Sequence, residues 1–549
     1  GSFYEADSSA DLVDAFDSII KSIKAIDTTY VEPSVTVNQF NRFSHRDDIY
    51  YALFKPQETA KWFGNLKKYR LAGSPAQVVD ANKVSAIDPA SGFFKVDARS
   101  EWSSDEDGNK VELGGAANQL PAPASRKIYS YLGSFPVAAD STALLKTYPV
   151  ASSNTDVTLD MLGITGQTTT YRSELLDWVR GLASDGTTPR YQLGDPLHSK
   201  PVLMTYDSDA VANTVDSTIF IGTNEGYLHA IDADTGEEVF AFIPEELLDN
   251  LDVYYSNQIV SPRPYGMDGA ITLWSDDGND DGDYLDASDD FVYLYTGMRR
   301  GGRSYYALDV SDRSAPEMLW QMDGGATGTT GFEELGQTWS EPKKITVKFD
   351  DGVHELLLFA GGYDTNQDSV TVRTADSMGR AIYMVDAKTG ALFWKAGDGN
   401  GYDLDLNDMD YSIPSDISVI DMNGDGLADQ FYVGDMGGQL WRFDIDQSNV
   451  SQKRSLVDGG VIADLAGTTK AENRRFYYAP DISLGVDGSD RYLAVGIGSG
   501  YRAHPLNEDI EDRFYLLKQY DYIYSAPGSY TKLAETDLYD ATLNLIMEG

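Results

Sequence analysis

One pattern recurs from Leu193 onward and limits the fold of the chain more than any other feature. Each copy has a glycine-containing turn, an apolar strand that ends in aspartate, a short polar turn, and a strand with an aromatic residue; the strand aspartates are Asp232, Asp309, Asp386 and Asp444. The first three lie at equal intervals, which exceed the roughly 40 to 50 residues of a plain propeller blade, so inserted loops are expected. Each unit has an apolar face that only its neighbours can cover, and this predicts a β-propeller. A solenoid or an array of β-sandwiches is the alternative.

The turn chemistry of the repeat supports this interpretation. A Thr-Gly pair follows two of the strand aspartates, and its glycines, Gly236 and Gly390, can take the positive φ that a tight reversal needs. The aromatic residue after the turn is expected to pack between blades. Trp320 and Trp394 follow a strand aspartate and Trp441 precedes one, all within strand-like runs, so the three are predicted to be core residues. Three proline-ending motifs are expected to mark the starts of blades, since the first residue of a strand can lack a ladder donor. They are His198–Pro201, Trp339–Pro342 and Tyr478–Pro480, and a worn fifth copy of the repeat spans Asp512–Lys518.

The pattern divides the chain into three regions. Residues 1–29 hold Gly1-Ser2, interpreted as a tag remnant on an internal fragment, and a helix over Ala10–Ile26 with apolar residues at helical spacing. Residues 30–192 form a β-rich region that packs on the propeller or contributes to it, with one further helix near Ser173–Leu182. Residues 193–549 form the propeller. The expected fold class is mostly β: a modified, seven-bladed propeller with inserted loops and a few short helices.

Composition excludes several classes of function. The chain has 43 Lys and Arg against 87 Asp and Glu, a formal charge of −44, which would repel a nucleic acid. It has no cysteine, so disulfides, zinc-thiolate sites, iron-sulfur clusters and thiol nucleophiles are excluded. No stretch approaches the roughly 18 apolar residues of a membrane span. Such an acidic surface suits a cell-exterior setting, where calcium can bridge carboxylates.

The segment from Asp421 to Asp429 has the spacing of a calcium loop. Side-chain oxygens stand at positions one, three, five and nine, a backbone carbonyl at seven and glycine at six; the predicted ligands are Asp421, Asn423, Asp425, Leu427 and Asp429. Position twelve is Tyr432, so the bidentate glutamate of an EF-hand is missing and Asp429 must close the shell. The flanking residues alternate like strands, which places the loop in a β-hairpin. The alternative is an acidic turn that binds nothing, and magnesium is disfavoured because it demands stricter octahedral geometry.

A second stretch fits the same start of the motif. Its predicted ligands are Asp277, Asn279, Asp281, Asp283 and Asp286, with Asp286 as the closing residue. The surrounding sequence is so acidic that a match by composition alone is equally plausible. This second, weaker metal candidate is therefore left open.

Several ordered motifs resemble a known family. They are Leu193–Val202, Ile221–Asp232, Leu335–Pro342 and Tyr432–Asp444, and they resemble the C-terminal region of PilY-type proteins, the tip-associated adhesins and biogenesis factors of type IV pili. The resemblance runs from about Tyr50 to Lys518. It implies a modified propeller with a calcium loop in one blade, and it matches the helix over 10–26 to the last helix of a von Willebrand factor A-like domain. The family pattern continues past the equivalent of Tyr515, so the last propeller strands are expected to be missing.

The resemblance also implies a function. We expect a calcium-binding, non-enzymatic module that acts in pilus biogenesis, calcium-dependent extension and retraction, twitching motility and surface adhesion. Its expected partners are minor pilins, the pilus tip complex, and host or abiotic surfaces. Its expected location is the pilus tip at the surface of a Gram-negative bacterium, also in association with the outer membrane or periplasm.

Two other functions remain as alternatives. The segments Ala230–Phe240 and Val385–Trp394 resemble the tryptophan-docking repeats of pyrroloquinoline-quinone dehydrogenases, which also bind calcium. The repeats are few and interrupted, however, and the vicinal cysteine pair common in that class cannot exist here. The other alternative is a scaffold for minor pilins that binds no external ligand.

Overall fold

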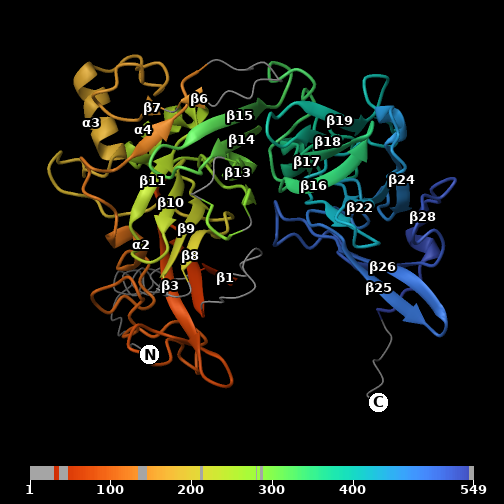
Figure 1. The fold of residues 1–549 in the computed structure, drawn as a ribbon, viewed down its shortest axis with the longest axis horizontal. Helices are drawn as coiled ribbons and strands as arrows, with labels where there is room; N and C mark the ends of the chain where they lie inside the picture. The colour runs from red at the N-terminus through yellow and green to blue at the C-terminus, as the bar shows by residue number, and fades with distance from the viewer. Residues whose placement is uncertain are drawn as a thin grey trace, which may run out of the picture. The chain divides into compact units, whose positions relative to one another are not determined.

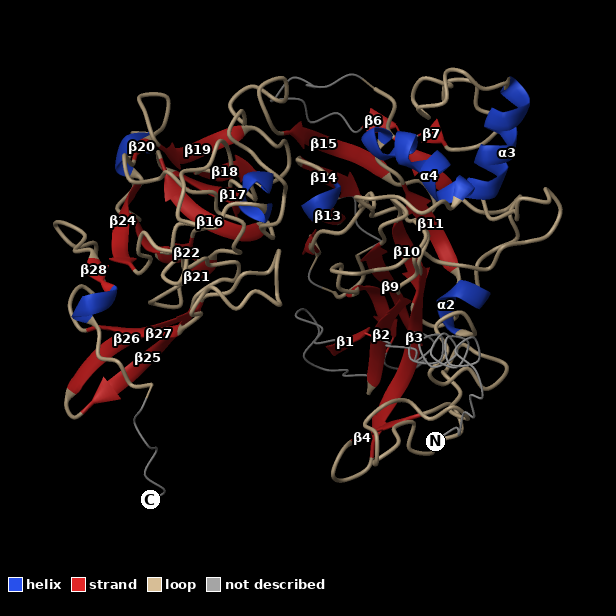
Figure 2. Ribbon diagram, turned by 180° about the vertical axis from the view of Figure 1, so that it is seen from behind, coloured by secondary structure: helices blue, strands red, loops and turns tan. Residues whose placement is uncertain are grey.

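The computed structural model describes residues 30–35, 47–133, 145–146, 148–209, 214–279, 281–284 and 289–542. The predicted helix over 10–26 lies outside these residues. The described chain is mostly β, with few helices, as predicted (Figures 1 and 2). It divides into two compact units, one formed by the described residues up to Ser130 and by Pro149–Pro264, the other by 131–148 and the residues from Tyr265 onward. The predicted start of the propeller at residue 193 falls inside the first unit and stays a prediction.

The first unit contains two sheets. One has the strand order β1-β2-β3-β4, all antiparallel, with β1 Tyr30–Val35, β2 Asp48–Lys55, β3 Phe63–Ala72 and β4 Gln77–Val79. The other runs β7-β5-β11-β10-β9-β8, with β5 Ile128–Ser130, β7 Tyr148–Pro149, β8 Val202–Asp209, β9 Thr214–Gly222, β10 Leu228–Asp232 and β11 Glu238–Phe242. Strands β8 to β11 pair in sequence order as an antiparallel meander, the arrangement of a propeller blade.

Short helices complete the first unit. They are α2 Gly115–Asn118, α3 Thr169–Val179, the 3₁₀ helix η1 Glu245–Asn250 and α4 Leu251–Ser256. Helix α3 confirms the predicted helix near 173–182 but begins earlier, because the Thr168 hydroxyl caps it by accepting the Tyr171 backbone N–H at 3.1 Å. Strand β7, Tyr148–Pro149, lies where the chain returns to this unit.

The second unit contains four further meander sheets. The first has β12 Ile271–Asp276, β13 Phe291–Gly297, β14 Ser304–Asp309 and β15 Glu317–Asp323, extended by β6 Leu145–Lys146. The second has β16 Lys343–Phe349, β17 Gly352–Ala360, β18 Ala381–Asp386, β19 Leu392–Gly397 and the short β20 Leu404–Asp405. The third has β21 Ser418–Ile420, β22 Gln430–Gly434, β23 Gln439–Ile445, β24 Val457–Asp464 and the short β28 Leu533–Ala534. The last is β25 Asp481–Asp487, β26 Asp490–Gly498 and β27 Phe514–Gln519.

These sheets confirm the predicted blade boundaries. Strands β8, β16 and β25 each begin directly after the proline of one of the three motifs. The described residues thus form five sheets of blade type: two that precede the β16–β20 sheet in sequence, that sheet itself, and two that follow it. The expected number of seven blades is not confirmed. Short 3₁₀ helices interrupt the connections at η2 Arg299–Gly301, η3 Thr365–Asp368, η4 Lys453–Ser455 and η5 Glu535–Asp537. Among the described residues, no helix has the length and apolar character needed to cross a bilayer.

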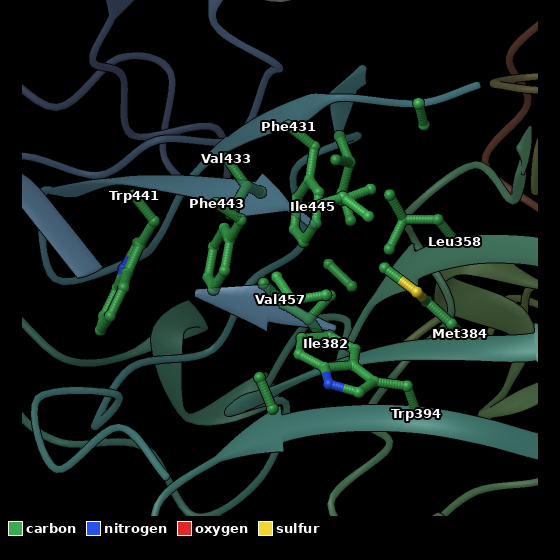
Figure 3. Packing of buried hydrophobic residues seen from close by; sticks show 14 of the residues in the cluster. Leu358, Ile382, Met384, Trp394, Phe431, Val433, Trp441, Phe443, Ile445 and Val457 are labelled. Carbon is green, nitrogen blue, oxygen red and sulfur yellow. The ribbon is translucent and has the colours of Figure 1, made fainter. Parts of the chain in front are cut away.

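The largest core of the second unit joins the β16–β19 and β21–β24 blades. Trp394 and Trp441 are both fully buried in it, as predicted, and Phe431 stacks on Phe443 with ring centroids 4.5 Å apart (Figure 3). Each of the two blades therefore buries part of its apolar face against the other.

The repeated Asp–Thr–Gly turn receives a tryptophan. The Asp386 carboxylate accepts hydrogen bonds from the Thr389 N–H and hydroxyl, both at 2.8 Å, and Gly390 has φ +70°. A Cβ on Gly390 would come within 2.8 Å of the Trp320 ring, whose Nε1 donates to the Ala387 carbonyl at 3.1 Å. The prediction that Trp320 packs between blades is confirmed.

The same turn in the first unit receives a tryptophan that the repeat did not predict. Gly236 has φ +76°, and a Cβ there would come within 2.6 Å of the Trp102 ring. Trp102 Nε1 donates to the Asp234 carbonyl at 3.1 Å. Trp102 lies far upstream of the repeat, so its spacing gave no signal.

Candidate metal centre

The Asp421–Asp429 segment connects two antiparallel strands, as predicted. Strand β21 pairs with β22 in the register Ser418↔Tyr432 and Ile420↔Gln430. The Asp429 N–H donates to the Ile420 carbonyl at 2.9 Å and closes the loop at its base. The ends of the loop are therefore fixed by sheet hydrogen bonds, while its tip is exposed to solvent.

Backbone N–H groups of the loop point at the Asp421 carboxylate. It accepts hydrogen bonds from Gly424 at 2.6 Å and Gly426 at 2.8 Å, with longer contacts from Asn423 and Asp425 at 3.3 Å. These bonds, the one from Gly426 first, lower the pKa of Asp421. Gly426 has φ +85°, the left-handed conformation that the sixth position of the motif requires.

The alternate side chains continue the same winding. Asn423 Oδ1 accepts the Asp425 N–H at 2.8 Å, and Asn423 Nδ2 donates to Asp425 Oδ2 at 3.1 Å. Asp425 Oδ1 accepts the Leu427 N–H at 2.9 Å. The side chains of Asp421, Asn423 and Asp425 therefore each stabilise the turn that follows them.

The half-buried Asp429 closes the loop. Its Oδ2 accepts the Met422 N–H at 2.7 Å. Burial raises the pKa of Asp429, and the charges of Asp425 and Asp421 raise it further. The three carboxylates are thus close enough to repel one another, and a set of oxygen donors of this kind fits a hard cation such as calcium. In the described part of the chain, no group of three or more acidic or histidine side chains is placed so that it could hold a metal ion.

The loop is attached to the neighbouring blade and borders a cleft. The Ala428 N–H donates to the Thr346 carbonyl of β16 at 3.0 Å, and Gln447 Nε2 donates to the Ala428 carbonyl. A cleft of about 650 Å³ lies beside the loop. Its lining includes Met422, Asn423, Asp429, Asp444, Asp446, Arg454, Asp458 and Tyr524.

The second candidate adopts the same hydrogen-bonding pattern. The Asp277 carboxylate accepts N–H bonds from Gly282 at 2.6 Å and Asn279 at 3.3 Å, and Gly282 has φ +90°. Asn279 Oδ1 accepts the Asp281 N–H at 3.1 Å, and Asp281 Oδ1 accepts the Asp283 N–H at 2.9 Å. Both loops join the first and second strands of a blade, here β12 and β13.

The residue that closes the second loop was missed in the sequence. Asp290 Oδ1 accepts the Gly278 N–H at 3.0 Å, which is the bond that Asp429 makes to Met422 in the first loop. The predicted closing ligand, Asp286, lies outside the described residues. Asp290 comes later than the motif spacing allows, and only its place directly before β13 could have suggested it.

Comparisons with known proteins give the family. The sequence profile of the PilY1 beta-propeller domain matches residues 191–485, more than half of the chain. A type IV pilus biogenesis factor PilY1 homolog of Xylella fastidiosa is 31% identical over 53% of this chain and 18% of its own length. Type IV pilus biogenesis factor PilY1 of Pseudomonas aeruginosa strain UCBPP-PA14 is 26% identical over 81% of this chain and 35% of its own length.

A solved structure is also similar. The crystal structure of the Pseudomonas aeruginosa PilY1 C-terminal domain has 22% sequence identity and a TM-score of 0.39, covering 59% of this chain and 62% of that one. This chain spans about a third or less of the length of the curated relatives named above. The profile match extends over four of the five blade-type sheets and the start of the fifth. The chain belongs to the PilY1 beta-propeller domain family.

Proposed function

We propose that this chain is a calcium-binding module of a type IV pilus-associated protein at the surface of a Gram-negative bacterium. The observation that carries the proposal is the Asp421–Asp429 hairpin, where backbone N–H groups and alternate side chains wind around one carboxylate. The family assignment supports the pilus role, because its relatives are named as pilus biogenesis factors.

The residues that would hold calcium are Asp421, Asn423, Asp425 and Asp429, with the carbonyl of Leu427. When bound, calcium would supply the positive charge that lets the three carboxylates lie together without mutual repulsion. The Ala428–Thr346 hydrogen bond would then connect a rigid loop to β16 of the adjacent blade. We infer that occupancy of the loop fixes the junction of the two blades and thereby influences pilus extension, retraction and adhesion.

The first experiment measures calcium binding and its effect on stability. Saturation at about 100 times the Kd should raise the free energy of unfolding by about 2.7 kcal/mol, and a chelator should reverse the gain. Asp425→Ala should abolish both binding and the response to chelator. Asp398→Ala removes an exposed carboxylate from another loop of the same unit and should leave both unchanged. Calorimetry without calcium-dependent heat in the unaltered chain would refute the proposal.

The pilus role needs a test in cells. A host strain that carries Asp425→Ala in the full-length protein should lose the calcium dependence of twitching, and the Asp398→Ala strain should keep it. Pull-down with minor pilins, with and without calcium, then separates an adhesion module from a scaffold, since a scaffold would bind them regardless of the metal. Equal twitching by the two strains at every calcium concentration would exclude regulation by this loop.

The dehydrogenase alternative is separated by a simple assay. The expectation of a non-enzymatic role predicts no dye reduction after addition of pyrroloquinoline quinone, calcium and an alcohol. Turnover above that of a heat-denatured sample would favour the enzyme.

A further inference from the structure

An aromatic cluster in the second unit lies where strands begin and end. Trp339 precedes β16, Tyr363 follows β17 and Tyr477 precedes β25, and with Met436 they form one buried group. Trp339 stacks on Tyr363 with centroids 4.4 Å apart, and Tyr477 lies 6.0 Å from Trp339. The cluster is a buried aromatic core that does not belong to the calcium loop.

Three arginines surround Trp339. The guanidinium carbons of Arg299, Arg300 and Arg502 lie 4.3, 5.2 and 5.9 Å from its ring centroid. Arg300 is neutralised, because its Nη1 and Nη2 donate to both oxygens of Asp368 at 3.0 and 2.8 Å. Asp368 Oδ1 also accepts a hydrogen bond from the Tyr363 hydroxyl at 2.8 Å. The Asp368 carboxylate is therefore already engaged by Arg300 and Tyr363.

The other two arginines differ from Arg300. Within the described residues, neither Arg299 nor Arg502 has a carboxylate within ion-pair distance; Arg502 Nη1 donates to the Tyr478 hydroxyl at 2.5 Å. Arg299 Nε is buried without a hydrogen-bond partner among the described atoms. Burial, with the nearby charge of Arg502, lowers the pKa of Arg299 to about 10, so it remains protonated at neutral pH. Two guanidinium groups thus lie beside the aromatic cluster without a described carboxylate in direct contact, although the charges of Asp268 and Asp416 act on Arg299.

A cavity opens beside these groups. It has a volume of about 310 Å³, and its lining is aromatic and glycine-rich with one basic and one acidic side chain: Tyr477, Tyr478, Gly498, Ser499, Gly500, Tyr501, Arg502, Pro505 and Asp512. The acidic residue, Asp512, accepts the Ser499 hydroxyl at 2.9 Å. A further buried arginine, Arg475, stacks on Tyr501 at 3.9 Å, and its Nη1 has no partner among the described atoms.

We propose that this cavity binds a ligand through its carboxylate group, with Arg502 as the direct partner and Arg299 and Arg475 as buried positive charges behind it. A guanidinium donates two parallel hydrogen bonds to a carboxylate, and a planar, singly charged group fits between aromatic walls. A phosphate dianion would call for more donors than the single lining arginine. The carboxylate can belong to a small dicarboxylate or to an acidic polypeptide side chain.

Calorimetric titration of the 549-residue chain tests this assignment. The probes are succinate, an acetylated Glu-Glu peptide amide and inorganic phosphate. Succinate or the peptide should bind, and Arg502→Gln should weaken that binding by about tenfold or more, since a charge-assisted hydrogen bond is lost. Arg502→Lys should restore part of it. Tighter binding of the peptide identifies a polypeptide source for the carboxylate, and tighter binding of succinate a small molecule.

A matched control separates a site from general electrostatics. Arg491→Gln removes the same charge from an exposed position on β26, where Arg491 Nη1 contacts the Tyr524 hydroxyl at 3.3 Å. It should leave carboxylate affinity unchanged. Equal losses in the two Gln variants, tighter binding of phosphate than of either carboxylate probe, or no binding of either at 10 mM would overturn the proposal. Arg502 is only half-buried, so Arg502→Gln should fold; retained calcium binding by this variant verifies that it does.

Discussion

The two acidic loops share an internal hydrogen-bonding pattern but differ in length and in how their ends are attached. Each wraps its backbone N–H groups onto a first aspartate, has a positive-φ glycine at position six and joins the first two strands of a blade. The first loop is short and its base is hydrogen-bonded to the sheet and to the neighbouring blade. The second runs from Asp277 to Asp290, and a Cβ on Gly278 would lie within 2.3 Å of the Asp289 carboxylate. The motif thus determines the backbone conformation of the loop. Its length and its hydrogen bonds to the surrounding strands determine how firmly the oxygens are held, and that rigidity controls calcium affinity.

The largest expected difference is in the effect of removing the first aspartate. Asp421→Ala should reduce metal affinity at the tighter site by about 100-fold, or about 3 kcal/mol, because a ligand and the organiser of the loop are lost together. Asp277→Ala should leave that affinity unchanged. Terbium luminescence titration measures both. Should Asp277→Ala remove the tighter site instead, the ranking of the two loops would be reversed.

A buried carboxylate provides a second contrast, between the β21–β24 blade and the β12–β15 blade that hold the two loops. Asp435 directly follows β22, whereas Met298 occupies the corresponding place after β13, and both are fully buried. Burial raises the pKa of Asp435 to about 7, although its carboxylate accepts hydrogen bonds from Trp441 Nε1 and the Gln439 N–H, each at 2.9 Å. The folded state therefore holds a proton that the unfolded state releases near pH 4.

The sign of the pH effect follows from that shift. Stability should fall as pH rises from about 4 to 7, by up to about 1.4 kcal/mol per pH unit, and should level off above 7. Relative to the unaltered chain, Asp435→Asn should gain about 2 kcal/mol between pH 5 and 8, whatever its absolute stability. Met298→Leu should not alter the pH profile. Denaturant unfolding at pH 5 and at pH 8 measures this difference in stability. Parallel pH profiles for the unaltered chain and Asp435→Asn would contradict the raised pKa of Asp435.

The smallest expected effect concerns the closing residues. In chelator, Asp429→Ala should destabilise the chain by about 1 kcal/mol, because it leaves the Met422 N–H without its charged acceptor. Asp290→Ala should cost less, since the longer loop can rearrange around Gly278. Thermal unfolding of both variants without metal makes the comparison, and an equal or larger loss for Asp290→Ala would show that the longer loop is as firmly held as the shorter.

Sequence patterns predicted the local features better than the long-range ones. The strand starts after Pro201, Pro342 and Pro480 and the hairpin around Asp421 followed from turn chemistry and alternation, which act between near neighbours. The docking of Trp102 on the Gly236 turn and the closure of the second loop by Asp290 did not, because both depend on contacts between distant or irregularly spaced residues. The arginines around Trp339 were missed for the same reason, since Arg299 and Arg300 follow β13 whereas Arg502 follows β26 of another blade.

The tryptophan-receiving turns have a consequence for how the blades can diverge. In two blades the turn with aspartate, threonine and glycine receives an indole, which comes from the last strand of a blade in the case of Trp320 and from an upstream loop in the case of Trp102. Selection can therefore replace a whole insertion while it preserves one glycine and one indole. Swapping such segments between relatives should succeed when that pair is retained, even where the intervening sequence is unrelated.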